Sequence, residues 1–394
     1  MRIGIIGAGI GGLAAAAQLA RSGHDISIVE AFDKAAPVGA GLLLQPPGKA
    51  VLKRLGLLED AMASGVPVSR LHSSTTSDRV LLDISYQDLE GIAREGLGIQ
   101  REKLHALLLK SAIEAGVKIT FSAPADAIER ESSRLFIGSN DEKHGPFDFV
   151  IVSSGSRSNW LKSEEFGRRA SPYNWGCLWA TVPFPTSLTP NTLHQRCNGT
   201  RKMIGILPTS RSGGSRHAAL YWSLETAHTK KWMSDSYHFF LDELQSLWPE
   251  AAMAAASVDK NAFTFARYHD VWTKRPYNER VLLIGDAAHG TSPQLGQGAS
   301  MALLDAFTVD QCLLDFPDHL DNAMEQYLTR RMAHQRYVRY ASRALTPVFQ
   351  HSSRYIGVLR DLFCGPLAGL PGPRGIAVQT LACELFNNFR SELT

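Results

Sequence analysis

Three glycines near the start of the chain have the spacing of a nucleotide-binding turn. Gly7, Gly9 and Gly12 follow an apolar run, and a G-x-G-x-x-G turn of this kind lets a pyrophosphate approach the backbone. The helix that should follow offers N–H groups and a partial positive charge to phosphates. Glu30 ends the next apolar run, about where a carboxylate accepts hydrogen bonds from a ribose. The pattern predicts a dinucleotide site but does not separate NAD from FAD.

A second group of residues suited to ligand binding lies within residues 280–306. An apolar strand is followed by an acid and then by a loop that opens a helix: Gly285, Asp286, Pro293, Gly296, Gln297 and Gly298. An acid at the carboxyl end of a strand sits where open α/β sheets bind ligands. Glycines at a helix start let backbone N–H groups face a ligand. A plain strand–loop–helix connector is the alternative that spacing alone leaves open.

Hydrophobic periodicity predicts the elements that must position these two groups. We expect strands at 3–6, 26–29, 117–121, 147–155 and 281–284. We expect helices at 13–21, from the double proline at 46–47 to about residue 62, at 98–115, at 298–315 and at 322–345. The buried strand at 147–155 ends in a glycine turn, which is typical of a parallel sheet.

The middle of the chain has a different pattern. Residues 170–275 are rich in Trp, Tyr, Thr and Pro. Short alternating segments, such as 178–183, 203–207 and 218–224, predict an antiparallel sheet with one helical insertion around 232–247. Residues 67–95 predict a shorter β-excursion. The sequence therefore predicts a discontinuous nucleotide domain with a β-rich domain inserted into it.

Composition places the chain among ordinary globular proteins. Its 394 residues are 44% hydrophobic and 20% charged, which suggests two or three domains. The net charge of +3 is too small to indicate a nucleic-acid partner. Five scattered cysteines form no C-x-x-C pair and no metal-ligand spacing, so we expect no metal site and a reducing compartment. A first strand at Arg2 leaves no room for a signal peptide, and a cytoplasmic location is expected.

These motifs resemble a known family. The first glycine motif, the 280–306 segment and Arg101 together are similar to the FAD-dependent aromatic hydroxylases. These are single-component flavoprotein monooxygenases of the salicylate, hydroxybenzoate and ubiquinone-biosynthesis type. The resemblance covers nearly the whole chain and favours FAD over NAD. It implies an α/β fold: a discontinuous Rossmann-like FAD-binding domain, an inserted, mainly antiparallel substrate domain and a helical C-terminal region.

The resemblance also implies which residues contact FAD. The glycine motif takes the pyrophosphate, Glu30 the adenosine ribose and Asp286 the ribityl chain. Arg101, which begins an R-x-x-L helix start with Leu104, reaches FAD. The segment from Gly39-Ala40-Gly41 to Gln45 runs beside the flavin, and the P-x-x-G-Q-G loop lies under it. The predicted cofactor-binding residues are Gly7, Gly9, Ile10, Gly11, Gly12, Glu30, Ala31, Gly41, Gln45, Arg101, Gly285, Asp286, Pro293, Gly296, Gln297, Gly298 and Ala299.

The implied reaction is hydroxylation of an aromatic or similarly activated ring, with NADH or NADPH and O2, through a flavin hydroperoxide. No catalytic side chain is predicted, because the cofactor carries the chemistry. Alternatives are another flavoenzyme on the same scaffold (an epoxidase, halogenase or reductase), an FAD-holding protein with impaired NAD(P)H turnover, or a membrane-associated enzyme. Expected partners are a small aromatic substrate and O2, with the chain a monomer or homodimer.

One stretch departs from the family pattern. The family carries G-A-D-G-x-x-S-x-x-R after the third sheet strand, whereas residues 152–161 read VSSGSRSNWL. Ser154 stands in place of the aspartate and Leu161 in place of the final arginine. FAD has other contacts, so we expect its binding to survive, while reduction by NAD(P)H is in question. Pro47 and Ser300 are smaller departures.

Several other residues have two interpretations. His289 is expected to be a packing and hydrogen-bonding residue rather than an acid or base. The arginine-rich stretch 330–343 is expected to be the solvated face of a long helix; with the apolar tail it could instead meet an acidic membrane surface. Trp175, Trp179, Tyr221 and Trp222 are expected to pack the sheet, and one or two of them could wall an aromatic pocket.

The predicted division of the chain has six parts. The FAD-binding domain comprises 1–68, 97–166 and 277–345, the substrate domain comprises 69–96 and 167–276, and a helical tail spans 346–394. Ligands in such architectures sit between the domains.

Overall fold

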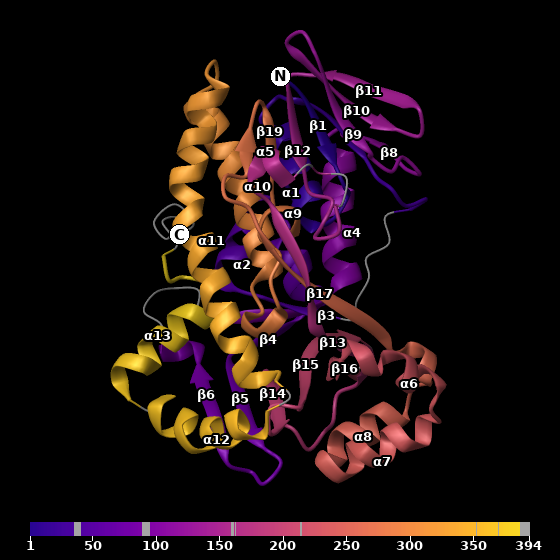
Figure 1. Cartoon of the computed structure of the whole chain (residues 1–394), viewed down its shortest axis with the longest axis vertical. Helices are drawn as coiled ribbons and strands as arrows, with labels where there is room; N and C mark the ends of the chain where they lie inside the picture. Colours follow the sequence, from indigo (N-terminus) through magenta and orange to yellow (C-terminus); the bar gives the residue numbers. More distant parts are fainter. Residues whose placement is uncertain are drawn as a thin grey trace.

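The computed structural model describes residues 1–34, 41–88, 95–158, 161, 163–212, 215–351, 353–368 and 370–386. Its two large sheets lie towards opposite ends of the long axis of the molecule (Figure 1). Helix α11 (Leu320–Phe349) runs along much of this axis and joins the two ends.

A six-stranded sheet forms one end, in the order β18-β19-β12-β1-β2-β8. The strands are β1 (Arg2–Ile6), β2 (Asp25–Val29), β8 (Lys118–Thr120), β12 (Phe149–Val152), β18 (Tyr277–Asn278) and β19 (Val281–Leu283). All pairs are parallel except β18 with β19. The apolar runs of β1, β2, β12 and β19 are buried on both faces, as expected for a parallel sheet covered by helices.

Helices α1 (Ile10–Arg21), α4 (Arg101–Glu114) and α10 (Gly298–Asp315) pack together on this sheet. Four consecutive alanines of α1, 14–17, are fully buried, and their small side chains allow the helices to approach closely. The helix predicted at 298–315 is confirmed at both ends. α1 begins at Ile10, three residues earlier than predicted.

A seven-stranded sheet forms the other end, in the order β17-β13-β16-β15-β14-β5-β6. The strands are β5 (Arg70–Thr75), β6 (Val80–Ser85), β13 (Arg169–Pro183), β14 (Thr192–Asn198), β15 (Lys202–Ser212), β16 (Ser215–Glu225) and β17 (Thr264–Trp272). Only the β14–β5 pair is parallel, so the predicted antiparallel character is confirmed. The six predicted domain ranges themselves stay a prediction.

The two faces of the seven-stranded sheet have different neighbours. Along β16, Leu220 and Trp222 pack with α7 (Tyr237–Leu247) and α8 (Pro249–Ala256) in one apolar cluster. Ala219 and Tyr221, which alternate with them along the strand, belong to a second cluster, which includes parts of β3 and the C-terminal helices. We call this second side the inner face of the sheet.

A small sheet in the order β3-β7-β4 fills the space between the two ends. Its strands are β3 (Gly41–Leu44), β4 (Val66–Val68) and β7 (Gly96–Gln100). A Cβ on Gly98 would lie 1.9 Å from the carbonyl oxygen of Pro208, and one on Gly41 would lie 2.5 Å from Cγ2 of Thr209. Bare backbone at these glycines therefore lets β3 and β7 press directly against β15. A further sheet, β11-β10-β9, comprises β9 (Ala127–Glu131), β10 (Arg134–Ser139) and β11 (Glu142–Phe147).

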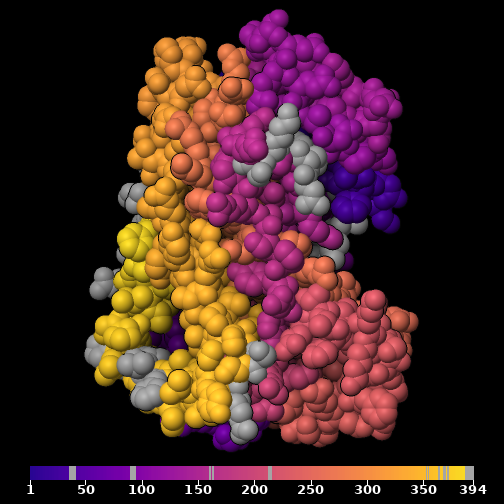
Figure 2. Space-filling model, viewed as in Figure 1, coloured from indigo at the N-terminus to yellow at the C-terminus, as the bar shows by residue number. Residues whose placement is uncertain are grey.

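The C-terminal part continues from α11 into α12 (Arg354–Ala368) and α13 (Pro371–Leu381), at the lower left in Figures 1 and 2. Large apolar side chains on their surface include Tyr355, Val358, Leu359 and Ile376, each more than half exposed. Within the described residues, no helix has both the length and the apolar composition needed to cross a membrane.

Four predictions about local structure are wrong. The helix after the double proline is two helices, α2 (Pro46–Arg54) and α3 (Leu58–Ser64), because Gly56 adopts a left-handed conformation between them (φ +67°). Residues 98–100 belong to strand β7, where pairing with β3 and β4 overrides the local apolar spacing. The single insertion predicted at 232–247 is the run α6 (Thr229–Ser234), α7 and α8. Arg331, expected on a solvated face, is fully buried.

Candidate functional site

The first glycine motif forms the predicted turn between β1 and α1. Gly7 has φ +99°, and a Cβ on Gly12 would lie 2.1 Å from the Gly7 carbonyl oxygen, so neither position accommodates a side chain without strain. Gly9 precedes the helix, and a Cβ there would meet no atom of the described residues within 4 Å. No side chain caps the N-terminus of α1. The first turn, Ile10 to Gly12, therefore presents N–H groups towards open space.

Glu30 directly follows β2, and its side chain bonds to the glycine turn. Its carboxylate accepts hydrogen bonds from the backbone N–H of Ala8 (2.6 Å) and of Phe32 (3.0 Å). These bonds hold the carboxylate beside the glycine turn, with further lone pairs available for a ribose hydroxyl. Ala31 follows on the surface.

Arg101 begins helix α4 and is exposed. One turn later, His105 Nε2 lies 2.7 Å from the carbonyl oxygen of Ala8. Burial lowers the pKa of His105, and the charges of Arg101 and Glu30 also act on it. His105 thus ties the start of α4 to the glycine turn, and this places Arg101 near the predicted phosphate site. No motif in the sequence points to this histidine.

Gly285 and Asp286 follow strand β19. Gly285 has φ +57°, a conformation that favours glycine, and Asp286 begins the short helix α9 (Asp286–His289) with an exposed side chain. A Cβ on Gly285 and a Cβ on Gly11 would each lie 3.3 Å from Cβ of Ala302, on α10. The two motifs, far apart in sequence, therefore meet on the same stretch of α10.

A buried charged network lies behind this turn. The Asp305 carboxylate accepts hydrogen bonds from the Gly285 backbone N–H (2.9 Å), Arg331 Nε (2.8 Å) and Gln335 Nε2 (3.0 Å), and lies 2.5 Å from His289 Nε2. Asp305 and Arg331 are fully buried. Burial by itself would raise the pKa of Asp305, but the charges of His289 and Arg331 and the hydrogen bonds hold it below its ordinary value. His289 is therefore a hydrogen-bonding residue, as predicted.

The P-x-x-G-Q-G loop leads into α10. Pro293 opens a short 3-10 turn, Gly296 has φ +62°, and α10 starts at Gly298 and Ala299 without a side-chain cap. Among the residues that the structure describes, none has an atom within 4 Å of a Cβ placed on Gly298. Like α1, helix α10 therefore directs uncapped N–H groups towards open space.

Ser300 connects this helix start to β3. Its hydroxyl accepts a hydrogen bond from the backbone N–H of Gln45 (2.9 Å). The departure noted at Ser300 thus has a structural role, because it fixes Gln45 and Gly41 of the predicted flavin-side strand against α10. Gly39 and Ala40 lie outside the described residues.

The inner face of the seven-stranded sheet carries neutral polar and aromatic side chains. Gln195 Nε2 donates to the Tyr221 hydroxyl, and the Trp179 and Tyr221 rings lie 5.4 Å apart. Burial raises the pKa of Tyr221 and of Tyr268, and raises that of the neighbouring Cys177 to about 12, so all three stay protonated near neutral pH. Trp222, by contrast, packs on the opposite face, and Trp175 is buried.

The stretch that departs from the family pattern is held by an arginine from outside it. Ser154 Oγ lies 2.6 Å from Ser158 Oγ. The buried Arg168 donates to the carbonyl oxygens of Ser156 (2.9 Å), Ser158 (3.4 Å) and Ala287 (2.9 Å). Arg168 therefore fastens this turn to helix α9, next to Asp286.

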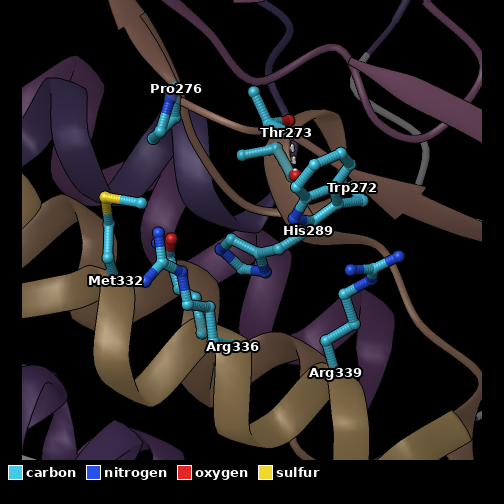
Figure 3. Close-up of a pocket in the computed structure, with 9 residues that line it drawn as sticks. Trp272, Thr273, Pro276, His289, Met332, Arg336 and Arg339 are labelled. Carbon is cyan, nitrogen blue, oxygen red and sulfur yellow. Dashed lines mark hydrogen bonds between the residues drawn. The ribbon is translucent and has the colours of Figure 1, made fainter. Parts of the chain in front are cut away.

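A small hollow lies on the far side of His289, where its lining includes Trp272, Arg336 and Arg339 (Figure 3). The Arg339 guanidinium lies 5.0 Å from the centre of the Trp272 ring. His289 and Gln335, two partners of Asp305, line the hollow, whereas the predicted cofactor-binding residues do not, so we do not assign it to the predicted cofactor.

The described residues fit a bound dinucleotide. Uncapped helix starts at Gly9 and Gly298 suit a pyrophosphate and an anionic ring. Beside the start of α10, the buried side chains of Gln45 and Gln297 each keep one nitrogen or oxygen without a partner among the described residues. Unpaired buried polar atoms are rare in folded proteins and indicate a missing partner. Within the described residues, no cluster of His, Cys, Asp and Glu is suited to a metal ion.

Comparison with known proteins agrees with this geometry. The family described as "FAD binding domain" matches residues 1–338. A 2-heptyl-3-hydroxy-4(1H)-quinolone synthase of Pseudomonas aeruginosa is 27% identical over 322 residues, covering 78% of this chain and 79% of that protein. An FAD-dependent urate hydroxylase of Klebsiella pneumoniae is 25% identical over 343 residues, covering 84% and 86%. The crystal structure of Klebsiella pneumoniae HpxO complexed with FAD and uric acid has a TM-score of 0.82 at 20% identity, covering 98% of each chain.

The chain therefore belongs to the FAD-binding family whose match spans most of its length. Within that family it is an FAD-dependent monooxygenase, an oxidoreductase with FAD as cofactor and NADH or NADPH as co-substrate. The family resemblance, the fold class and the choice of FAD over NAD are thereby confirmed.

Proposed function

We propose that this enzyme hydroxylates a flat aromatic ring held between the loop Pro293–Gly298 and the inner face of the seven-stranded sheet. The observation that carries the proposal is the position of β3. Its backbone presses on the sheet at Thr209, while Gln45 at its end hydrogen-bonds to Ser300 of α10. Strand β3 thus connects the helix that follows the predicted flavin loop with the sheet that carries the aromatic side chains.

The predicted FAD contacts support this proposal. In it, the N-termini of α1 and α10 bind the pyrophosphate and the flavin edge, Asp286 the ribityl chain, and Glu30 the adenosine ribose. When bound, FAD accepts a hydride from NAD(P)H and activates O2. The protein's part is to position the ring, exclude water and stabilise charge. A helix N-terminus stabilises a nearby anion by about 0.3–1 kcal/mol, and more when the site is partly buried.

The inner face also indicates the kind of ring. Its described central side chains, Trp179, Gln195, Tyr221 and Tyr268, carry no formal charge. Aromatic rings at these positions suit offset or edge-on contact with a flat substrate. Neutral hydrogen-bonding groups suit a hydroxyl, amide or ring nitrogen better than a carboxylate, which loses its hydration without a cationic partner.

Anaerobic reduction is the experiment that tests the proposal. The holoenzyme is mixed with NADH and, separately, with NADPH, and the visible absorbance of the flavin is followed with and without a panel of neutral and carboxylated aromatic compounds. We expect bleaching that a neutral ring accelerates. Under 18O2, that ring should gain one labelled oxygen. Bleaching without any oxygenated product would instead favour a reductase, and a halogenated product with added halide would favour a halogenase. A flavin that stays oxidised throughout would contradict the proposal.

We also propose that the enzyme acts as a monomer or homodimer in the cytoplasm. Light scattering of the holoenzyme checks the first part. One structural neighbour, 2-methyl-3-hydroxypyridine-5-carboxylic acid oxygenase, is described in a tetrameric form, with a TM-score of 0.75 at 21% identity. A tetramer in solution would contradict our proposal.

A further inference from the structure

Gln45 is a buried amide that uses only part of its hydrogen-bonding capacity. The residue is fully buried at the end of β3. Its Oε1 accepts a hydrogen bond from the Tyr86 hydroxyl at 2.6 Å, whereas its Nε2 has no partner among the described residues. An unpaired amide donor inside a protein is costly, so a partner is expected when the protein is at work.

Tyr86 determines which way this amide faces. Burial raises the pKa of Tyr86, so its hydroxyl stays protonated and donates to the amide oxygen. The Nε2 of Gln45 must then point the other way. A Cβ on Gly296 would lie 3.9 Å from this nitrogen, so the amide N–H groups face the P-x-x-G-Q-G loop.

Gln297, in that same loop, has the complementary unpaired atom. Its side chain is buried, and its Nε2 donates to the carbonyl oxygen of Thr380 in α13. A carbonyl oxygen can only accept, so this bond fixes the amide orientation. The Oε1 of Gln297 is left as a buried acceptor without a partner in the described part of the chain.

We propose that Gln45 and Gln297 together bind the edge of a ring that presents a carbonyl beside an N–H group, and that Tyr86 is the positioning residue that directs the Gln45 donor. An imide or lactam edge matches this donor and acceptor. Such an edge belongs to the pyrimidine side of the flavin and also to aromatic lactam substrates. The inference rests on the FAD site of the proposed function, but not on which ring is hydroxylated.

Two binding measurements separate the two sources. The first titrates apoprotein with FAD, followed by quenching of flavin fluorescence. The second titrates FAD-saturated protein with 2-pyridone, a small aromatic lactam, followed by its perturbation of the flavin visible spectrum. The variants are Gln45→Met, Tyr86→Phe and the double variant. Tyr277→Phe is the matched control, because it removes a tyrosine hydroxyl whose partner, Asp321, lies on α11.

We expect Gln45→Met to weaken one of the two ligands by about threefold to tenfold, the size of one neutral hydrogen bond. Tyr86→Phe should weaken the same ligand by less, because the amide remains but is no longer held. The double variant should match Gln45→Met, since Tyr86 acts only through Gln45. Loss in the FAD titration assigns the edge to the flavin, and loss in the 2-pyridone titration assigns it to the substrate.

Unchanged affinity for both ligands in Gln45→Met would overturn the proposal. So would a loss from Tyr86→Phe that persists in the Gln45→Met background, because Tyr86 would then act by itself. Circular dichroism of each variant checks folding, and Tyr86→Phe, which preserves the ring, keeps the test valid if Gln45→Met folds poorly. Failure of wild-type apoprotein to bind FAD would instead contradict the cofactor site as a whole.

Discussion

The Gly285–Gly298 segment has buried polar groups on both sides, and the two sides differ in how fully those groups are paired. Behind the turn, Asp305 has four partners, and one of them, Arg331, also contacts His334 Nδ1 and the Met301 carbonyl oxygen. In front, the side chains of Gln45 and Gln297 are also buried, yet each has one atom without a partner in the part of the chain that the structure describes. From residue types alone, the charged pair Asp305 and Arg331 would be the expected ligand-binding group, and the two glutamines would not.

The difference separates a structural role from a ligand-binding one. A buried ion pair whose hydrogen bonds are complete has nothing left to offer a ligand, and its removal is felt by the fold. An amide with one unpaired atom contributes less to the stability of the fold, and that atom can form a hydrogen bond with a ligand. Substitutions of Asp305 or Arg331 should therefore change the stability of the fold, whereas substitutions of Gln45 or Gln297 should change ligand binding.

Asp305→Asn should have the largest effect. It leaves the Arg331 charge buried without its counterion, which should lower the free energy of unfolding by about 3–5 kcal/mol. Urea unfolding of the apoprotein measures this loss. Asp315→Asn is the control, because that carboxylate pairs with Arg330 while about half exposed and should cost no more than about 1 kcal/mol. Equal losses of stability in the two variants would show that the buried Asp305 pair is no more important to the fold than a partly exposed ion pair.

Asp286→Ala should have the next largest effect, and on binding rather than on folding. The Asp286 side chain is exposed, so its loss should change the free energy of unfolding of the apoprotein by less than about 0.5 kcal/mol. Loss of a charged hydrogen bond should weaken FAD binding by about tenfold or more. The flavin content after purification and an FAD titration measure this. A fully flavinated variant would count against the predicted ribityl contact.

Low pH should selectively weaken the hydrogen-bonded network of Asp305. The pKa of Asp305 is lowered in the folded protein, so the network stabilises the fold at pH values above the ordinary carboxyl pKa of about 3.9. That stabilisation is lost as the pH falls from there towards the lower, folded-state pKa. The stability difference between wild type and Asp305→Asn should be constant from pH 7 to about pH 5 and shrink below it. A constant difference down to pH 3 would show that ionisation of Asp305 is not its source.

Ser154→Asp should have the smallest effect. Ser154 lies in the turn that Arg168 holds against α9, and its hydroxyl lies 2.6 Å from that of Ser158. We expect FAD affinity to change by less than about threefold and the rate of anaerobic reduction by NAD(P)H to change by up to about tenfold. Stopped-flow absorbance measures the rate. An unchanged rate would mean that this departure from the family pattern is neutral.

Local motifs were predictable from the sequence, and long-range pairings were not. The glycine turn at Gly7 and the start of α10 depend on backbone conformations that glycine spacing reports directly. Asp305 and Arg331 lie on different helices, so nothing local shows that they pair, and Arg331 was wrongly expected in solvent. Tyr86 lies in a stretch with weak periodicity, and its contact with Gln45 exists only once β3 packs against the sheet.

The strand order of the six-stranded sheet has a consequence for how the protein is made. Ile3 pairs with Phe149, and Val150 pairs with Val281. The strand that carries the first glycine turn is synthesised before the other strands of its sheet, yet that sheet is complete only after β19 has followed. At about 5–20 residues per second, that delay is on the order of tens of seconds. During synthesis every strand of the seven-stranded sheet, the last being β17, is made before β19 and the Gly285–Gly298 segment that follows it.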